Sequence, residues 1–557
     1  MIDEQHTQYT QYTQYTSYAR LVLSGEITAC QYIKQACSRY LSWFDRPEYE
    51  FRPEAVDKYV NFCAKLKHYT GKSAGQPFKL SPFQFWIACN IFGFYNKETD
   101  ERVVKNVYIE MARKQGKSFF AASICLYCLI ADGESAAEVE LVANSAKQAG
   151  ILFRMCHTLC SNLDKKHKFL DTYRDSIKFD KTHSVLQVLS SDAGNNDGWN
   201  SSCYVIDEYH AAPDSSMYDV MKSSQGMRSQ PLAIVITTAG FNLFGPCYAM
   251  RTTCCEILSG VKVDDSQFAA IYELDRDDDW KDESVWEKAN PNIDITVKRS
   301  YLQEQVLQAT NQPSMEVPVR TKNFNQWMSS SDVWIQNDIL LSATQDIDIS
   351  TFKDRICYGG VDLSAVSDLT AFSLMTVVDD NEEIKYFFKT YYYLPESCLY
   401  DNPNSEVYKQ WKRHKLITIT PGNVVDYDYL TEDILRLVGQ GVLIEKIAYD
   451  QYNATQFAIN CTEQGLPLEP YAQSLWNFNR PTKEFERLIK SGKVVLDNNE
   501  ITRWCFSNVA LKVDHNDNVK PIKGGTNMGK IDGVISCLEA LGTYLGTPHY
   551  DNQIMTI

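Results

Sequence analysis

The segment that most constrains the fold lies near residue 110, where an apolar stretch, a short polar loop and a second apolar stretch follow one another. It reads VKNVYIEMARKQGKSFFAASICLYCLIA, residues 104–131. The first stretch predicts a buried strand, and the second predicts a helix that begins near Gly116 and Lys117. A Gly-Lys-Ser loop between a strand and a helix is the local structure in which backbone N–H groups bind phosphates. The segment therefore predicts a strand–loop–helix unit of a parallel α/β sheet.

The residues after this unit continue the alternation of strands and helices. Apolar stretches predict further strands in EVELVANS, SVLQVLSS, SCYVIDE and PLAIVITTA. The segment AKQAGILFRMCHTLCSNL has the apolar spacing of a helix. That order predicts a mostly parallel sheet with helices on both faces. A second Gly-Lys-Ser, residues 71–73, has no strand ahead of it, and we interpret it as a chance match.

The loop departs from the full phosphate-binding pattern at one position. The pattern G-x-x-x-x-G-K-[ST] has a glycine where this chain has Met111. Glycine is obligatory only where φ must be positive or where the backbone touches the ligand. The substitution is therefore tolerable if Met111 keeps an ordinary negative φ. Lys117 then supplies positive charge to the phosphates, and the Ser118 hydroxyl binds Mg²⁺.

Three further segments supply groups that a nucleotide-hydrolysing site needs. CYVIDEYH ends a strand at Asp207, which can hold Mg²⁺ through water, and at Glu208, which can orient and deprotonate the attacking water. Acid pairs at strand ends also cap helices, but beside the loop they favour catalysis. IVITTAG ends the next strand at Thr237 and Thr238, near the expected γ-phosphate. FKLSPFQFW is expected to place Gln84 in an extended turn, where its amide can pair with an adenine edge. An ordinary surface glutamine is the alternative.

The second half of the chain begins with a different strand pattern. DRICYGGVDLS, DLTAFSLMTVV and EEIKYFFKTYYYL predict three strands joined by short turns. Alternating helices and strands follow to about residue 544. Hairpin-connected strands followed by crossover units predict a mixed sheet.

Four aspartates of this second half form a second candidate site. Asp362 ends an apolar strand and Asp368 lies across a tight turn from it, in GGVDLSAVSDLTAF. Asp450 ends another strand in IEKIAYDQYNA, and Asp532 lies on a helix in MGKIDGVISCLEAL. One such aspartate alone is more often a cap or turn residue. Several from separate elements are what a two-metal phosphodiester hydrolase requires, because Mg²⁺ or Mn²⁺ ions need bridging carboxylates to activate water.

Composition narrows the class of protein. A chain of 557 residues is too long for one hydrophobic core, and an apolar share of 44% is typical of globular proteins. Without an apolar run long enough for a bilayer or a signal sequence, we expect a cytosolic protein. The 17 cysteines lie mostly in apolar stretches, so we expect buried, reduced thiols rather than zinc ligands. A net charge of −16 argues against a surface coated in basic residues but permits transient DNA binding in a local basic groove.

Taken together, these segments resemble the large terminase subunits of tailed double-stranded DNA bacteriophages. The similarity runs over nearly the whole chain and includes GKSAGQPFKLSPFQFW, ARKQGKS, LVANSAKQA, YVIDEYHA, VITTAG, WEKANPN, FNQW, GVDLSAVSDLTA, IAYDQYNA and KIDGVISCLEAL. The resemblance implies an ATPase that drives DNA into a procapsid. It also implies a nuclease that cuts concatemeric DNA into genome lengths.

The implied fold class is α/β, with an ASCE-type P-loop NTPase domain followed by an RNase H-like mixed-sheet nuclease domain and preceded by a small helical region. The expected parts are the helical N-terminal region with its polar QYT-repeat tail (1–75), the ATPase domain (76–335, with a lid or linker part at about 262–335), a linker (336–353), the nuclease domain (354–545) and a C-terminal tail (546–557).

The resemblance also implies site residues, carried over by matching motif. The ATP-binding residues are Gln84, Arg113, Lys114, Gly116, Lys117, Ser118 and Asp207, with Ser118 and Asp207 on Mg²⁺ and Glu208 as the catalytic base. Arg113 senses or braces the γ-phosphate, and the family often replaces the first loop glycine and carries Arg or Lys mid-loop, as at 113 and 114. The coupling motif is Thr237, Thr238 and Gly240. The nuclease residues and metal ligands are Asp362, Asp450 and Asp532, with Asp368 as an auxiliary ligand.

Cofactors and partners follow from the same resemblance. We expect ATP with Mg²⁺ in the first site and two divalent ions, Mg²⁺ or Mn²⁺, in the second. Expected partners are double-stranded DNA, the portal protein, the procapsid and the small terminase subunit, with no membrane. The chain is expected to package as a homo-oligomeric ring, a pentamer, in the host cytoplasm while docked on the procapsid. Arg228 is the candidate arginine finger that completes a neighbouring site, with an ordinary surface arginine as the alternative.

Two other functions fit parts of the sequence. DEYH also matches the D-E-x-H box of helicases, so a helicase-nuclease is one alternative. Such a helicase needs a second RecA-like domain, and here the carboxylate site follows instead. An inactive prophage remnant with a structural role is the other alternative. Retention of Lys117, Glu208 and the three nuclease aspartates argues against it.

Overall fold

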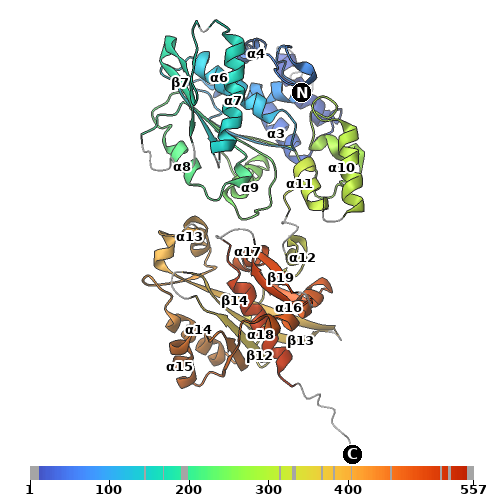
Figure 1. Ribbon diagram of the computed structural model, residues 1–557, viewed down its shortest axis with the longest axis vertical. Helices are drawn as coiled ribbons and strands as arrows, with labels where there is room; N and C mark the ends of the chain where they lie inside the picture. The colour runs from blue at the N-terminus through green and yellow to red at the C-terminus, as the bar shows by residue number, and fades with distance from the viewer. Residues whose placement is uncertain are drawn as a thin grey trace, which may run out of the picture. The chain divides into compact units, whose positions relative to one another are not determined.

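The chain folds into two compact units, Met1–Met328 and Ser329–Ile557 (Figure 1). The structure is a computed structural model, and it describes residues 12–143, 146–166, 168–189, 198–312, 315–328, 334–364, 368–380, 383–402, 404–451, 454–514, 517–524 and 529–548. Among the described helices, none combines the length and the hydrophobicity that a bilayer crossing requires.

The first unit is built on an eight-stranded sheet with strand order β10-β3-β9-β8-β4-β7-β6-β5. The strands from β10 to β7 are parallel, and β6 and β5 continue the sheet antiparallel. Their bounds are β3 (Asn106–Glu110), β4 (Glu138–Ala143), β5 (Asp171–Thr172), β6 (Ser176–Phe179), β7 (Ser184–Leu189), β8 (Cys203–Asp207), β9 (Leu232–Thr237) and β10 (Gln267–Ile271). The predicted strands of this half are confirmed. Because β3, β9 and β8 are parallel neighbours, their carboxyl ends lie at one edge of the sheet.

Helices cover the sheet of the first unit and extend beyond it (Figure 1). They are α2 (Thr13–Ser24), α3 (Gln31–Ser42), α4 (Pro53–Cys63), α5 (Pro82–Gly93), α6 (Lys117–Ile130), α7 (Ala146–Leu163), α8 (Ser216–Ser223), α9 (Pro246–Leu258), α10 (Arg299–Asn311) and α11 (Glu316–Phe324). One hydrophobic core joins α2 to α5 with the sheet. A separate small core, which includes Trp286 and Phe324, holds the segment around α10 and α11.

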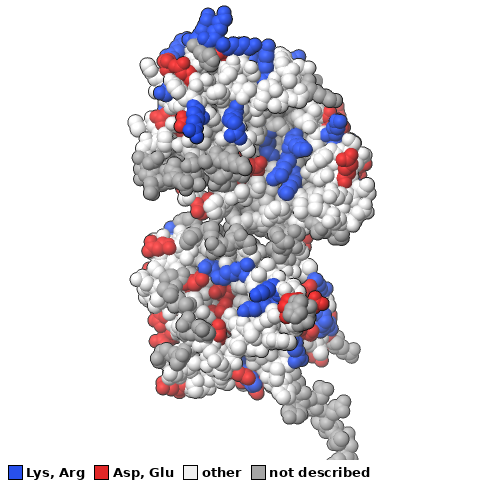
Figure 2. Space-filling model, viewed as in Figure 1, with Lys and Arg blue, Asp and Glu red and all other residues white. Residues whose placement is uncertain are grey.

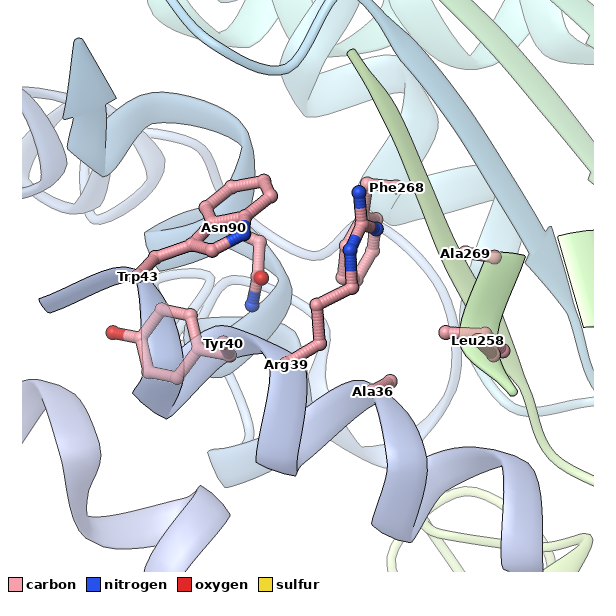
Figure 3. A pocket seen from close by; sticks show the side chains of 8 residues that line it. All are labelled: Ala36, Arg39, Tyr40, Trp43, Asn90, Leu258, Phe268 and Ala269. Carbon is pink, nitrogen blue, oxygen red and sulfur yellow. The ribbon is translucent and has the colours of Figure 1, made fainter. Parts of the chain in front are cut away.

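The N-terminal helices pack directly on the sheet. Figure 3 shows Arg39 extending from α3 toward Phe268 of β10. The Arg39 guanidinium donates to the carbonyls of Gln267 at 2.7 Å and Asp264 at 2.6 Å, and lies 5.0 Å from the centre of the Trp43 ring. These contacts fix α3 to the edge strand of the sheet.

The end of the QYT repeat is structured, although we expected a polar tail. Thr13 begins α2, and Tyr15 and Thr16 are buried. The Tyr15 hydroxyl donates to Asp57 Oδ1 at 3.0 Å. Helical spacing turns this tyrosine toward the core, which the polar composition alone does not reveal. The preceding repeats, up to residue 11, lie outside the described residues, as does the end of the expected C-terminal tail from residue 549.

The second unit is built on a mixed sheet with strand order β11-β18-β14-β13-β12-β16-β17, and β15 pairs with β14. The three strands β12, β13 and β14 are antiparallel neighbours, as the sequence predicted. β16 and β17 add parallel on the other side of β12. The strands are β11 (Thr344–Gln345), β12 (Ile356–Asp362), β13 (Thr370–Asp380), β14 (Glu383–Pro395), β15 (Thr418–Thr420), β16 (Leu443–Tyr449), β17 (Leu468–Pro470) and β18 (Val494–Asp497), with a separate hairpin β19 (Val509–Val513) and β20 (Val519–Lys523).

Seven helices are described in this unit: α12 (Asn337–Ser342), α13 (Ser405–Arg413), α14 (Tyr427–Gly439), α15 (Thr455–Glu463), α16 (Leu475–Lys490), α17 (Glu500–Ser507) and α18 (Asp532–Gly546). The segment 336–353, which we expected as a linker, is part of the fold. It contains α12 and β11, and β11 pairs with β18. Leu340 and Ile347 are buried, and these apolar side chains anchor a stretch whose polar composition suggested an open connection.

Candidate active sites

The phosphate-binding loop connects β3 to α6 at the carboxyl edge of the first sheet. Gly116 precedes α6 with a φ of 85°, in the left-handed region that glycine adopts without strain. Lys114 also has a positive φ, of 65°, whereas Met111 does not. The prediction that Met111 keeps an ordinary backbone conformation is confirmed. In this loop the positive φ angles are therefore at positions 114 and 116, and position 111 does not need glycine.

Lys117 lies inside the loop rather than in solvent. Its Nζ donates to the carbonyl of Ala112 at 2.9 Å and also to that of Met111. Burial lowers the pKa of Lys117 to about 8, although the nearby carboxylates of Glu208 and Asp207 favour its charged form. The lysine is thus held where a phosphate bound at the start of α6 can accept from it.

The two acidic residues of the first site lie at the end of β8. Burial and then the charge of Glu208 raise the pKa of Asp207 to about 6. Burial also acts to raise the pKa of Glu208, but the hydrogen bond and charge of His210, with the charge of Lys117, bring it below the ordinary value. Glu208 has a φ of 55°. An ionised glutamate in a rare backbone conformation is typical of a residue held for catalysis.

His210 connects this glutamate to the end of β9. Its Nδ1 lies 3.2 Å from Glu208 Oε2 and 3.1 Å from Thr237 Oγ1. The main-chain N–H of His210 donates to the same Thr237 oxygen at 3.0 Å, and the Thr237 hydroxyl donates to the Thr238 carbonyl at 2.9 Å. Because a carboxylate only accepts hydrogen bonds, the Glu208 contact is favourable when Nδ1 carries a proton. The two segments predicted as catalytic pair and coupling motif are therefore in direct contact.

The residues after Thr238 contact the FNQW segment, which lies near the end of the first unit. A Cβ on Gly240 would lie 3.0 Å from His210 Cβ and 3.2 Å from Trp327 Cζ3, so only glycine fits there without a shift. The Ala239 N–H donates to Asn325 Oδ1 at 2.6 Å. Asn325 Nδ2 and Trp327 Nε1 each donate to Glu110 Oε1 at 3.0 Å.

Glu110 is a buried carboxylate that sequence reasoning missed. It ends β3 immediately before the loop and is 0% exposed. Besides the two donors above, it accepts from the Tyr108 hydroxyl and lies 3.4 Å from Arg251 Nε. Its place at the end of an apolar strand was the available signal, shared with Asp207. These contacts join the FNQW segment to the base of the phosphate-binding loop.

The outer side of the loop is fixed by two asparagines of the WEKANPN segment. Gln115 Nε2 donates to Asn290 Oδ1 at 2.8 Å, and Gln115 Oε1 accepts from the Asn292 N–H at 2.9 Å. Asn292 Nδ2 donates to the Gln115 carbonyl at 3.0 Å. The Arg113 N–H donates to the Lys322 carbonyl at 3.0 Å, and the Arg113 side chain is exposed. The segment around α10 and α11 therefore holds the loop in place.

Gln84 does not lie in an extended turn, as we expected, but in the first turn of α5. Its Oε1 accepts from the Ser81 N–H at 3.1 Å in a capping box, and its side chain is buried. A Ser-Pro start followed by Gln at the third helical position is a helix-start signature. The helix nevertheless brings Gln84 to the loop, because its Nε2 lies 3.4 Å from where a Gly116 Cβ would stand.

Arg228, the candidate arginine finger, makes its contacts within its own chain. It precedes β9, so it lies at the amino edge of the parallel strands, opposite the loop. Its guanidinium donates to the carbonyls of Asn200, Ser135 and Ala136 at 2.8 to 3.2 Å. The side chain is 8% exposed. Arg228 therefore holds loops of its own chain together.

The second site lies at the carboxyl ends of β12 and β16. These strands are parallel neighbours with Val361 opposite Tyr449. The next residues, Asp362 and Asp450, therefore leave adjacent strands at the same level. Strands in a sheet are about 4.8 Å apart, so the two carboxylates start from neighbouring positions.

The helix α18 completes the second site because it packs closely on β12. A Cβ on Gly360 would lie 2.1 Å from the Ser536 carbonyl oxygen and 2.6 Å from the Ala540 nitrogen. Glycine at 360 therefore permits the helix to touch the strand. Asp532 is the first residue of α18, and Glu539 follows seven residues later on the same face.

Glu539 and Gln473 belong to this site although sequence reasoning did not select them. Gln473 Nε2 donates to Asp362 Oδ1 at 3.1 Å and to Glu539 Oε1 at 3.2 Å. Glu539 is fully buried. The seven-residue spacing from Asp532 was the signal for Glu539, whereas no local pattern marks Gln473.

Electrostatics shows that these carboxylates act on one another. Burial, then the charge of Asp532 and that of Asp450, hold the pKa of Asp362 well above its usual range. Burial and the charge of Asp362 do the same for Glu539. Asp532 Oδ2 and Glu539 Oε2 are buried without a hydrogen-bond partner.

A divalent cation fits this set of groups. Among the described residues, no three His, Cys, Asp or Glu side chains are close enough to hold one metal ion as they stand. However, buried carboxylates with raised pKa values and unpartnered oxygens are the hard oxygen donors that Mg²⁺ and Mn²⁺ bind, and a cation offsets their mutual repulsion. Asp368, the expected auxiliary ligand, is paired with Lys530 Nζ at 2.7 Å and adds its charge to the surroundings of Asp532.

Comparisons with known proteins match both halves of the chain. The family model described as "Terminase large subunit, ATPase domain" matches residues 82–255, and "Terminase large subunit, endonuclease domain" matches residues 262–547. "Protein YmfN" of Escherichia coli (strain K12) is 32% identical over 357 residues, which cover 62% of this chain and 78% of that protein. "Terminase, large subunit" of Enterobacteria phage HK97 is 26% identical over 488 residues, which cover 86% of this chain and 92% of that protein.

A solved structure agrees with these matches in fold. The crystal structure of the HK97 bacteriophage large terminase aligns with a TM-score of 0.50 and 22% identity, over 89% of this chain and 100% of that one. The matches give no support to a helicase-nuclease or to an inactive remnant. The chain belongs to the terminase large subunit family, and it is an ATPase and DNA endonuclease that packages and cuts viral DNA.

Proposed function

We propose that the two activities are carried by two separate sets of residues, one in each compact unit. The observation that supports this division is the placement of the charged groups. Lys117, Asp207 and Glu208 lie at the carboxyl edge of the first sheet, whereas Asp362 and Asp450 lie at the ends of β12 and β16 in the second. Each set has the groups for one reaction and lacks those for the other.

In the first unit, the start of α6 binds the phosphates of ATP. Backbone N–H groups and Lys117 donate to the phosphate oxygens, and the Ser118 hydroxyl with Asp207 holds Mg²⁺. Glu208 accepts the proton of the attacking water, because its lowered pKa keeps it ionised at neutral pH. Gln84 contacts the adenine, and Arg113 contacts the γ-phosphate. The structural change that follows loss of the γ-phosphate is transmitted by the coupling motif, Thr237, Thr238 and Gly240. The motif does so through its contacts with His210 and Trp327.

In the second unit, Asp362, Asp450 and Asp532 hold two divalent ions, Mg²⁺ or Mn²⁺, with Asp368 as an auxiliary ligand. Held by these carboxylates, such ions would supply the activation of a water and the neutralisation of the leaving oxygen of the phosphodiester. Asp362 is oriented for this role by the hydrogen bond from Gln473. Gln473 also connects Asp362 to Glu539 through hydrogen bonds, and the charges of Asp532 and Asp450 act on Asp362.

The family also points to partners, because DNA and packaging components are common to terminase large subunits. We propose that this chain works in the host cytoplasm as a ring of five copies, docked on the portal of a procapsid. A small terminase subunit delivers the double-stranded DNA. Because Arg228 is engaged within its own chain, the arginine that completes a neighbouring ATP site is a different residue.

Two substitutions test the division of labour. Lys117→Ala is expected to lower kcat for ATP hydrolysis by about a hundredfold or more, because it removes a preorganised donor to the phosphates. Metal-dependent cutting of plasmid DNA is expected to stay at the wild-type rate. Asp362→Ala is expected to abolish cutting and leave ATP hydrolysis unchanged.

The activity that each variant keeps shows that one unit is folded, and calorimetry of the full chain checks that the other unit unfolds as in wild type. The measurements are phosphate release with ATP and Mg²⁺, and plasmid nicking with Mn²⁺. Loss of both activities in one folded variant would contradict the division into two sites.

A further inference from the structure

One face of α16 carries a row of exposed basic side chains that begins with an exposed tryptophan. Trp476, Arg480, Lys483 and Arg487 follow one another at intervals of four, three and four residues, which places them on one side of the helix. Trp476 is 73% exposed. The opposite side is buried through Phe478, Phe485, Leu488 and Ile489. We refer to the four exposed residues as the α16 row.

The α16 row begins beside the nuclease carboxylates. Gln473, which donates to both Asp362 and Glu539, lies three residues before Trp476. The hairpin β19–β20 holds this end of α16, because Asn479 Oδ1 accepts from the Val519 N–H at 3.1 Å. Lys520 Nζ donates to the Gln473 carbonyl at 2.5 Å. The row is therefore continuous with the site where the phosphodiester is cut.

The charge of this surface contrasts with that of the whole chain, whose net charge is −16. A groove of about 480 Å³ runs along α16 and is lined by Asn479, Arg480, Lys483, Glu484, Arg487 and Leu545, three basic residues against one acidic. Figure 2 shows Lys and Arg side chains, with acidic side chains among them, over the region where Figure 1 places α16 and β19. In the same unit, the positive charges of Lys523 and Lys530 act on Asp532, and Lys530 is paired with Asp368.

We propose that the α16 row is a track for duplex DNA that leads the phosphate backbone into the nuclease site. This inference rests on the proposed nuclease function of Asp362, Asp450 and Asp532. From residue 476 to 487 the helix rises about 16 Å. Duplex DNA carries one phosphate per about 1.7 Å of its axis, so a row of this length meets several phosphates.

Trp476 has a different role in the track from that of the three basic residues. An exposed indole carries no positive charge to pair with a phosphate, but it can pack on sugars or unstacked bases. Its position next to Gln473 places it at the end of the track, where the backbone is cut. The basic residues therefore determine how tightly the duplex is held, and Trp476 determines how the strand meets the carboxylates.

The first experiment measures duplex DNA binding by the full-length protein in EDTA, at several salt concentrations. The variant Arg480→Gln/Lys483→Gln/Arg487→Gln is expected to bind at least about tenfold more weakly than wild type. The slope of log K against log salt is expected to fall by about 0.9 for each phosphate contact removed, so by up to about 2.7. ATP hydrolysis is expected to be unchanged, and the unfolding transition of the second unit is expected to match wild type, which shows that the variant is folded.

Arg436→Gln is the matched control. Arg436 on α14 and Arg487 on α16 both have side chains that are 60% exposed, and each pairs with an acidic residue three positions earlier. The control is expected to leave affinity and salt slope unchanged. If the triple variant behaves like the control, or if its only defect is loss of binding to a protein of the packaging complex, the track is wrong.

A second experiment separates Trp476 from the basic residues. Trp476→Ala is expected to slow Mn²⁺-dependent cutting at least about tenfold without changing the salt slope of binding, since it removes no charge. A change of slope with an unchanged cutting rate would overturn the role given to Trp476. If wild-type protein does not cut DNA, the nuclease assignment itself fails. If wild type cuts and the α16 variants match it in both assays, only the track fails.

Discussion

At the scale of single residues, His210 shows how a short contact links two functional segments. Its Nδ1 lies within 3.2 Å of Glu208 Oε2 and 3.1 Å of Thr237 Oγ1. With a proton on that nitrogen, the imidazole stabilises the negative charge of Glu208. His210 therefore lies between Glu208, the proposed catalytic base, and Thr237 of the proposed coupling motif.

Replacing His210 with alanine is expected to lower kcat for ATP hydrolysis on the order of tenfold, a part of what general-base catalysis contributes. KM for ATP is expected to stay the same, because Lys117 and the loop still bind the phosphates. An interaction made only in the transition state lowers kcat and kcat/KM together. Steady-state kinetics over a range of ATP concentrations measures both constants.

The matched variant is His210→Asn, whose amide nitrogen takes nearly the place of Nδ1 and still donates. It is expected to recover a large part of the lost kcat. An Asn variant as slow as the Ala variant would show that the donor at this position does not orient Glu208.

At the scale of elements, the contact between β12 and α18 brings together the residues proposed for the nuclease site. Asp362 ends the strand, and Asp532 and Glu539 lie on the helix. The glycine at 360 sets the distance between the two elements, since any Cβ there would collide with the helix backbone. A mutation at Gly360 should therefore lower both the stability of the second unit and the rate of DNA cutting.

Gly360→Ala is expected to destabilise the second unit by about 1 to 3 kcal/mol or more, because overpacking forces backbone shifts. DNA cutting is expected to fall strongly as Asp532 moves away from Asp362, while ATP hydrolysis stays at the wild-type rate. Denaturant unfolding and plasmid cutting measure the two effects.

Gly439→Ala on α14 is the control, because a Cβ at that position meets nothing within 4 Å. It is expected to leave stability and cutting close to wild type. The role of Gly360 as the spacer between strand and helix is contradicted if Gly360→Ala is as stable and active as this control.

At the scale of the whole molecule, the chain is two folded units with separate hydrophobic cores. The ligands expected for the two units also differ, with nucleotide for the first and divalent ions for the second. A ligand that binds only the native state stabilises that state by mass action, by about 2.7 kcal/mol at a hundredfold excess over Kd. Each ligand should therefore protect its own unit.

Calorimetry of the full chain is expected to show two unfolding transitions. Mn²⁺ alone is expected to raise the midpoint of one, and ATP added afterwards to raise the other. Asp362→Ala should remove the first shift and Lys117→Ala the second. One transition that moves with both ligands would show that the units unfold together and would contradict this independence.

The sequence by itself determined the strands and helices around both sites, because apolar periodicity and strand-end acids are local signals. Asp207, Glu208, Asp362 and Asp450 all follow apolar strands, and the structure places them there. The Gly-Lys-Ser loop was also recognised from a local signal, and Met111 has the ordinary negative φ that the sequence predicted.

Only the tertiary structure decided what lies beside these residues. It engaged Arg228 with carbonyls of its own chain, put Gln84 on a helix, and paired β11 of the segment 336–353 with β18. It also brought Gln473 and Glu539 to Asp362, and Trp327 to Glu110. Such contacts join residues far apart in the chain, and they depend on strand order and on how closely helices pack on sheets. No local pattern encodes that geometry, because it exists only once the core has formed.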